Sequence, residues 1–296
     1  MSKPSLDTPT VEQLLQNRWG KVTDVHPLTG GLTSQVFGFS SDNVRYVVRI
    51  SSSVTSFQKD AFASQRFASP DLPIPQILDI GEVENGVYFC ISQRASGTRL
   101  KDLDAADIRR MANEAAQIIS VIGDADLTNT EGFGHFNAHG VAPFSSWQNF
   151  LLEVTDVRVF NWNSKRNIDR AMVGKATDAV SELAEHCPEI RCLIHGDLGS
   201  YNILTDAQRI TAVIDWDLGL FGDPLYEIAN LFFWHEDHLT PLLKQLGGTL
   251  RNAPKWRERV LCYQLHIGLH ELFYERYDID WLTNRCTELL DNKNTA

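Results

Sequence analysis

The chain has 296 residues, enough for one large domain or two lobes, so it can bury a core without disulfides or structural metals. Apolar residues make up 43% and charged residues 22%, as in ordinary soluble globular proteins. The net charge of −11 argues against a nucleic-acid partner, because a phosphate backbone requires basic surfaces.

The N-terminus and the cysteines indicate the compartment. The opening segment MSKPSLDTPT is polar and has no apolar stretch of the kind found in signal peptides. No run approaches the ~18 apolar residues that a membrane span requires. The five cysteines form no Cys-x-x-Cys pair, which favours reduced thiols. We therefore predict a cytoplasmic protein that does not contact a membrane.

The first 95 residues combine a helix with a series of strands. TVEQLLQNRW, residues 10–19, has apolar residues at helical spacing, and Thr10 is expected to cap it. Residues 21–92 predict an antiparallel sheet, with hairpin turns at SSDN (40–43) and at Asn85-Gly86. One helix is expected within residues 57–68.

The rest of the chain is predicted to be mostly helical. Short strands are expected around residues 193–204 and around RITAVIDW, residues 209–216. This change near residue 93 predicts an α+β fold with two lobes, a small antiparallel β-rich lobe (1–95) and a larger, mainly helical lobe (96–296). Two unlike lobes form a cleft, where ligands usually bind. Helices are expected near 104–122, 147–159, 168–186, 224–234, 256–276 and 280–290.

The stretch LIHGDLGSYNIL, residues 193–204, contains the strongest chemical pattern. His195, Asp197 and Asn202 are spaced as H-x-D-x-x-x-x-N, and kinase catalytic loops are spaced as H-R-D-x-x-x-x-N. In such loops the aspartate takes the proton of the acceptor hydroxyl, and the asparagine holds magnesium on the phosphates. Asp215 follows an apolar strand at the position of the aspartate in the kinase D-F-G motif. A lone Asp or Asn is more often a cap, and a lone His is more often a hydrogen-bonded structural residue, but together they predict a metal–nucleotide site.

The β-rich lobe is expected to hold the nucleotide. The segment LTGGLTSQVFGFS places Gly30, Gly31 and Ser34 in a loop where backbone amides can approach phosphate oxygens, although an ordinary Gly-Gly turn has the same pattern. In YVVRI, Arg49 stands at the position of the kinase lysine, and Val47 on the same face would lie against adenine.

Arg49 needs an acidic partner on the following helix. Asp60 is the candidate, although a solvated helix residue is an equally good interpretation from the sequence.

These segments, together with LPIPQILDIGE and ITAVIDWDLGLFGDPLYEIANLFFW, resemble the aminoglycoside phosphotransferase family, antibiotic kinases with a protein-kinase-like fold. The His-Gly-Asp form of the loop is typical of that family. FASPDLPIPQILDIGE, TEGFGHFNAHG and HIGLHELFY are similar to its hygromycin B 4-O-phosphotransferase branch. The resemblance covers most of the chain.

The resemblance implies an ATP- and Mg²⁺-dependent phosphotransferase that modifies a hydroxyl of an aminoglycoside or aminocyclitol antibiotic and confers resistance, with hygromycin B as the first substrate candidate. Asp197 would be the catalytic base, and Asn202 and Asp215 would bind magnesium. Arg49 would replace the phosphate-contacting lysine, a departure that leaves the details of phosphate binding open.

The same resemblance assigns the nucleotide base to the connector between the lobes. Gln93, Arg94 and Ala95 would hydrogen-bond adenine through their backbone. Whether GTP can replace ATP stays open, and we expect a monomer.

A small cationic glycoside requires carboxylates in its pocket. The net charge of −11 is consistent with an acidic pocket that attracts such a substrate. Each acidic residue taken alone is also typical of a solvated helix face. The candidates are Asp217, Glu236, Asp237, Glu271 and Glu275.

Three alternatives remain at this point. The first is a small-metabolite kinase of the same fold that acts on choline, homoserine or a sugar. The second is a nucleotide-binding module without catalysis, which the presence of Asp197, Asn202 and Asp215 disfavours. The third is a metal hydrolase, which would need more histidines near residue 195 than the sequence has.

Overall fold

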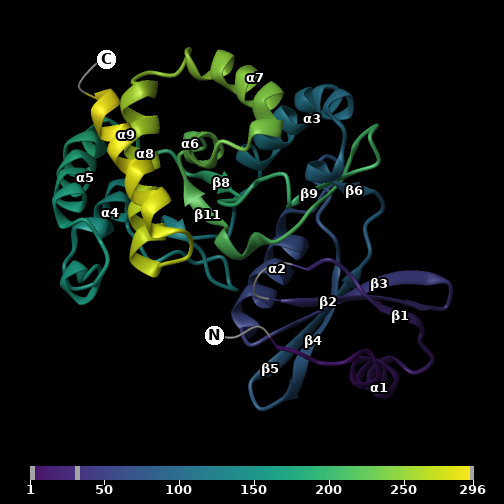
Figure 1. The fold of residues 1–296 in the computed structure, drawn as a ribbon. Helices are drawn as coiled ribbons and strands as arrows, with labels where there is room; N and C mark the ends of the chain where they lie inside the picture. The colour runs from purple at the N-terminus through teal and green to yellow at the C-terminus, as the bar shows by residue number, and fades with distance from the viewer. Residues whose placement is uncertain (1–3, 31–33, 294–296) are drawn as a thin grey trace. The chain divides into compact units, whose positions relative to one another are not determined.

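The computed structural model describes residues 4–30 and 34–293, and the chain divides into two compact units (Figure 1). The first unit runs to Arg99 and also contains the later segments Asn137–His139 and Asn202–Asp217. The second contains Leu100–Phe136, Gly140–Tyr201 and the chain from Leu218 onward. An N-terminal antiparallel sheet and a helical C-terminal region confirm the predicted α+β kinase-like fold. The lobe boundary at residue 95 stays a prediction.

A five-stranded antiparallel sheet in the order β1-β2-β3-β5-β4 forms the first unit. Both predicted hairpin turns are confirmed, because Asp42 and Asn43 (φ 50° and 63°) and Asn85 and Gly86 (φ 45° and 78°) adopt the left-handed conformation of two-residue turns. The strands are β1 (Thr23–Pro27), β2 (Gln35–Ser41), β3 (Val44–Ser51), β4 (Ile77–Glu84) and β5 (Val87–Gln93).

The two faces of β3 carry different side chains, as the alternation in the sequence predicts. Val48 and Ile50 are buried in one core cluster with Val11 of helix α1 (Thr8–Trp19). Arg49, on the other face, reaches Asp60 of helix α2 (Val54–Phe67). The pleat of one strand therefore separates the hydrophobic core from a polar site.

Helix α1 begins earlier than the sequence predicts. The Asp7 carboxylate accepts the N–H of Thr10 at 2.9 Å and caps the helix. Pro9 occupies the first turn, where its missing N–H needs no partner. The prediction of a Thr10 cap is therefore wrong, because Asp7 caps the helix and Thr10 lies within its first turn.

Three short strands complete the first unit. β9 (Ile203–Thr205) and β10 (Ile210–Val213) form a hairpin, and β6 (Thr98–Arg99) pairs with β9. The hairpin carries Asn202 at its start and Asp215 just after its end.

The second unit is built around helix α8, which packs against α5, α6 and α9 (Figure 1). Strands β7 (Gly134–His135), β11 (Leu220–Gly222) and β8 (Cys192–Ile194) form a small sheet in that order. The helices are α3 (Ala105–Gly123), α4 (Trp147–Leu151), α5 (Arg170–Leu183), α6 (Leu225–Trp234), α7 (Thr240–Leu250), α8 (Trp256–Tyr274) and α9 (Ile279–Lys293).

Two helix predictions fail in the second unit. The sequence does not predict α7, because Pro241, Gly247 and Gly248 lower its helix propensity, but proline is tolerated in a first turn. The predicted helix at 147–159 ends at Leu151 and continues as a single 3₁₀ turn, Leu152–Thr155. Among the described residues, no helix combines the length and apolar character needed to cross a bilayer.

Gly222 lies where β11 passes the fully buried ring of Trp147. A Cβ atom on Gly222 would lie 2.1 Å from Cζ3 of Trp147, so Gly222→Ala requires the core to shift. We expect the free energy of unfolding to fall by about 1–3 kcal/mol in urea titrations.

Gly174→Ala is the matched control. Gly174 is exposed on α5, and a Cβ atom there would meet nothing within 4 Å. Alanine favours the helix by about 0.5–1 kcal/mol, so this variant is expected to be more stable than the wild type. Equal stabilities for the two variants would contradict the packing described for β11.

Candidate active site

The loop that follows β8 is held by one buried carboxylate. Glu227 of α6 is 2% exposed and accepts three backbone N–H groups of this loop. The donors are His195 at 2.6 Å, Gly196 at 3.0 Å and Leu198 at 3.3 Å. Burial raises the pKa of Glu227 to about 7, and the three hydrogen bonds act in the opposite direction. The backbone on both sides of Asp197 is thus fixed.

Local geometry explains the glycine in His-Gly-Asp. Gly196 has a φ of 80°, and a Cβ atom there would lie 2.3 Å from the carbonyl oxygen of Leu218. Its own carbonyl accepts the side-chain amide of Asn230 at 3.0 Å. His195 is fully buried, and its Nδ1 accepts the N–H of Asp197 at 3.3 Å. The Asp197 residue itself is exposed, so a reactive carboxylate is presented on a rigid loop.

Glu236 contacts the next part of the same loop. Its carboxylate accepts the N–H of Ser200 at 3.1 Å and also the Ser200 hydroxyl. Its Oε2 atom lies 3.3 Å from Nε2 of His238. Ser200 stands between Asp197 and Asn202 in the sequence. The sequence suggests Glu236 as a substrate carboxylate, whereas in the structure both of its oxygens bind the loop.

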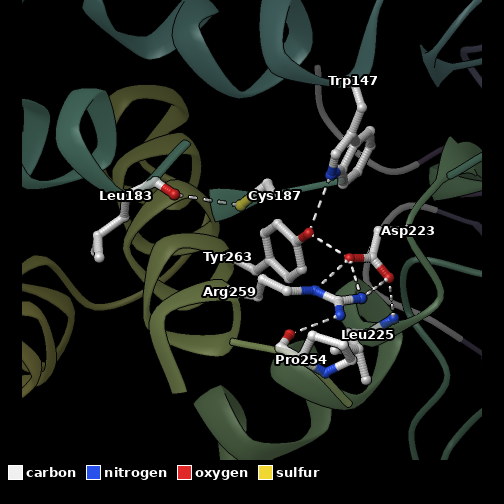
Figure 2. Close-up of polar contacts among 8 residues, drawn as sticks. All are labelled: Trp147, Leu183, Cys187, Asp223, Leu225, Pro254, Arg259 and Tyr263. Carbon is white, nitrogen blue, oxygen red and sulfur yellow. Dashed lines mark hydrogen bonds and ion pairs between the residues drawn. The ribbon is translucent and has the colours of Figure 1, made fainter. Parts of the chain in front are cut away.

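A buried ion pair holds the start of α6 against α8. Figure 2 shows Asp223 receiving three hydrogen bonds from Arg259 at 2.6–2.9 Å and one from the Tyr263 hydroxyl at 2.5 Å. The side chains of Arg259 and Asp223 are only 6% and 0% exposed. Asp223 also accepts, at 3.1 Å, the N–H of Leu225, the first residue of the helix that carries Glu227.

The first unit contains the predicted contact between β3 and α2. Arg49 and Asp60 form an ion pair with an N–O distance of 2.5 Å, and Arg49 also lies over the Phe57 ring. Burial alone would lower the pKa of Arg49, but the Asp60 carboxylate outweighs it and raises that pKa. The guanidinium is therefore charged, while its role toward phosphate stays a prediction.

Helix α2 also binds the segment after β10. Asp60 accepts the N–H of Trp216 at 2.7 Å, and Lys59 donates to the carbonyl of Asp217. Burial lowers the pKa of Lys59, although the carboxylates of Asp217 and Asp60 oppose the change. Two neighbouring residues of α2 thus fix the backbone on the C-terminal side of Asp215.

The β9–β10 hairpin brings Asn202 and Asp215 to the same end. Ile203 pairs with Val213, and the N–H of Ile214 donates to the carbonyl of Asn202 at 2.9 Å. Asp215 has a φ of 70°, a conformation that aspartate tolerates better than most residues. An amide oxygen and a carboxylate are oxygen donors, which hard divalent cations such as magnesium prefer.

Burial and several neighbouring charges act on Asp215. Although the residue keeps an exposed surface, partial burial and the carboxylates of Asp60 and Asp217 raise the pKa of Asp215 to about 6. Arg49 and Arg99 oppose this shift. Lys59 also acts on Asp217 and Asp60, so cationic groups balance the carboxylates around Asp215.

The loop between β1 and β2 contains the glycines that are predicted to approach phosphate. A Cβ atom on Gly30 would lie 2.9 Å from both the Ser34 carbonyl oxygen and the Val36 side chain, so the turn is tight. Arg99 donates to the carbonyl of Thr29 at 3.2 Å. Gly31 lies outside the described residues, so its predicted role is not addressed by the structure.

The predicted adenine-binding connector follows β5. The N–H groups of Gln93 and Arg94 donate to the carbonyls of Gln76 and Arg45, both at 3.1 Å. The adenine prediction therefore depends on the other backbone groups of residues 93–95. Val47 lies on the same strand face as Arg49, as predicted, and is half-buried.

The remaining substrate candidates lie in different settings. Asp237 and Asp217 are exposed. Glu271 lies 3.6 Å from Arg276, and Glu275 pairs with Lys165 at 3.0 Å. Burial raises the pKa of Glu271. Among the described residues, none of these ion pairs joins the four side chains to one another.

Sequence reasoning missed Glu227, Lys59 and Arg99. A signal exists only for Glu227, which is an acidic residue within the otherwise apolar helix segment LYEIANLFFW. A buried acid in such a helix indicates a backbone partner, because an unpaired buried carboxylate is costly. The partners of Lys59 and Arg99 lie far away in the sequence and left no local pattern.

Comparisons with known proteins identify the relatives of this chain. The profile of the phosphotransferase enzyme family matches residues 24–259. Hygromycin-B 4-O-kinase of Escherichia coli is 36% identical over 301 residues, which cover 98% of this chain and 87% of that protein. Viomycin phosphotransferase of Streptomyces vinaceus is 28% identical over 144 residues, 47% of each protein.

Solved structures give the same result. The crystal structure of aminoglycoside phosphotransferase APH(4)-Ia has a TM-score of 0.89 and 36% identity, and covers 96% of this chain and 99% of its own. A thermostable mutant of that enzyme, in a ternary complex with AMP-PNP and hygromycin B, has a TM-score of 0.88 and 38% identity over 95% and 98% of the two chains.

Glu227→Gln tests the buried carboxylate through its pH dependence. With its pKa raised from 4.5 to about 7, the folded state keeps a proton that the unfolded chain has lost. Stability from this proton is complete below about pH 4.5 and is lost as the pH rises through about 7.

Relative to the glutamine variant, the wild type should therefore lose about 1.4 kcal/mol per pH unit within that window. Urea titrations between about pH 5 and about pH 8 measure this difference. Exposed Glu185→Gln is the control. A constant difference between wild type and Glu227→Gln would show that this carboxylate titrates normally.

Proposed function

Because the chain belongs to the phosphotransferase enzyme family, with aminoglycoside phosphotransferases as near full-length relatives, we propose that it transfers the γ-phosphoryl group of ATP to a hydroxyl of hygromycin B. The 36% identity with hygromycin-B 4-O-kinase over 98% of the chain carries this proposal. The related ternary complex contains AMP-PNP and hygromycin B, which supports the choice of both substrates. We also propose that the protein is a cytoplasmic monomer and that its activity confers resistance to the antibiotic.

Asp197 is the proposed catalytic base. It orients the acceptor hydroxyl and takes its proton as the oxygen attacks the γ-phosphorus. The transition state is loose in most analyses, so placement of the acceptor matters more than base strength. Glu227 and Glu236 bind the backbone around Asp197 and so hold the loop that would orient the acceptor.

The phosphates of ATP and their magnesium ion are proposed to contact Asn202, Asp215 and Arg49. Asn202 and Asp215 would hold a magnesium ion, which neutralises charge on the phosphate oxygens when it is bound. Arg49, kept charged and oriented by Asp60, would donate hydrogen bonds to the phosphates in fork geometry, which a lysine cannot do.

The acceptor is proposed to contact the second unit. Trp234 and Trp281 stack with centroids 5.5 Å apart, and Tyr277 packs against both. Tyr277 and Trp281 are 53% and 36% exposed. Exposed aromatic faces suit the apolar faces of sugar rings, and exposed Asp237, which follows α6 in the sequence, suits an ammonium group.

Asp197→Ala is expected to lower kcat at least about 100-fold, because general base catalysis contributes that much or more. ATP binding should persist, since the proposed nucleotide ligands are other residues. Phosphate transfer from labelled ATP and nucleotide titration calorimetry measure the two properties. Asp178→Ala, at an exposed position of α5, is the control. Near-normal turnover by the Asp197 variant would exclude the proposed role.

A substrate panel tests the acceptor itself. ATP turnover is measured with hygromycin B, kanamycin, streptomycin and choline, and we expect hygromycin B to give the highest kcat/KM. A preference for choline would instead identify a small-metabolite kinase.

Trp281→Ala is expected to raise the KM for hygromycin B and to leave the KM for ATP unchanged. An unchanged KM for hygromycin B would rule out the aromatic surface as its contact.

A further inference from the structure

A second cluster of ligand-type side chains lies in the helical unit, outside the proposed active site. Glu153 belongs to the 3₁₀ turn after α4, and His266 and His270 lie on successive turns of α8. One ligand atom from each of the three side chains lies within 4.8 Å of the other two. We propose that Glu153, His266 and His270 bind a divalent transition-metal ion of the zinc class.

The spacing of the two histidines favours a shared ligand. Residues four apart on a helix project from the same face, as the two histidines of helical zinc sites do. Nε2 of His270 lies 2.9 Å from Oε1 of Glu153. A bound cation would replace the proton that these two groups share. Two imidazoles and one carboxylate form a common zinc-binding set, with water at the fourth position.

His266 lies in a fixed position within the helical unit. It is fully buried, and both of its ring nitrogens have hydrogen-bond partners. Its Nδ1 lies 3.0 Å from the Tyr226 hydroxyl, and its Nε2 lies 3.3 Å from the Phe150 carbonyl. A metal ion at one ring nitrogen would displace either the Tyr226 hydroxyl or the Phe150 carbonyl. The other nitrogen would keep its hydrogen bond, and such an outer contact orients metal-binding histidines.

The surroundings of the cluster are partly closed. The Glu153 carboxylate brings one negative charge into the cluster, 2.9 Å from Nε2 of His270. The rings of Phe160 and Tyr274 pack against His270, and its side chain is 14% exposed. A cation is therefore partly shielded from water yet can still enter.

The donor atoms separate this site from the nucleotide site. Magnesium prefers oxygen ligands and keeps several waters, whereas imidazole nitrogens favour zinc and related ions. Excess magnesium should thus leave the histidine cluster available. The proposal does not depend on phosphotransferase activity, because zinc binding is measured without nucleotide or antibiotic.

The test uses the full chain, stripped of metal and kept reduced, with excess magnesium present. Competition with a chromophoric chelator measures zinc affinity, and the visible spectrum of added Co²⁺ reports nitrogen coordination in a four- or five-coordinate site. We expect one zinc ion per chain. His270→Ala and Glu153→Gln should each weaken binding at least about 100-fold, the upper range for loss of an outer-shell partner. Exposed His139→Ala should bind zinc like the wild type.

Three outcomes would overturn the proposal: failure of the wild type to bind one zinc ion, wild-type affinity in either variant of the cluster, or weakened binding in His139→Ala. Urea titrations without metal establish that each variant is folded. If His270→Ala does not fold, Glu153→Gln decides the matter alone, because it keeps the size of the side chain.

Discussion

The hydrogen bonds from the loop of Asp197 to Glu227 are the interaction on which the proposed chemistry depends. One buried carboxylate accepts three backbone N–H groups and so fixes the backbone on both sides of the exposed aspartate. Buried carboxylates are costly unless they are hydrogen-bonded. The same cost makes the arrangement selective, since another loop conformation would leave Glu227 without its partners.

Helix α6 can hold this loop only because its own position is fixed. The Asp223–Arg259 ion pair joins the start of α6 to α8, and Tyr263 adds a further hydrogen bond (Figure 2). Buried ion pairs contribute little net stability, but loss of one partner costs about 3–5 kcal/mol. We therefore regard this pair as a constraint on the position of α6 rather than as a source of stability.

Charge is divided between the two units. In the first unit, Asp60 keeps Arg49 charged and also binds the backbone beside Asp215, so one carboxylate orients both a proposed phosphate ligand and a proposed metal ligand. In the second unit, carboxylates such as Glu236 bind the loop backbone. Acidic residues thus serve structure first, and the net charge of −11 alone does not identify a substrate site.

The sequence by itself determined those features in which local chemistry decides. The turns at Asp42-Asn43 and Asn85-Gly86, the two faces of β3 and the hairpin between Asn202 and Asp215 follow from φ preferences and from the period of a strand. Only the tertiary structure decided the partners of Glu227 and Glu236, because each contacts backbone about 30 residues or more away, which no local pattern encodes. Helix α7 shows the same limit, since its packing overcame the low propensity of its glycines.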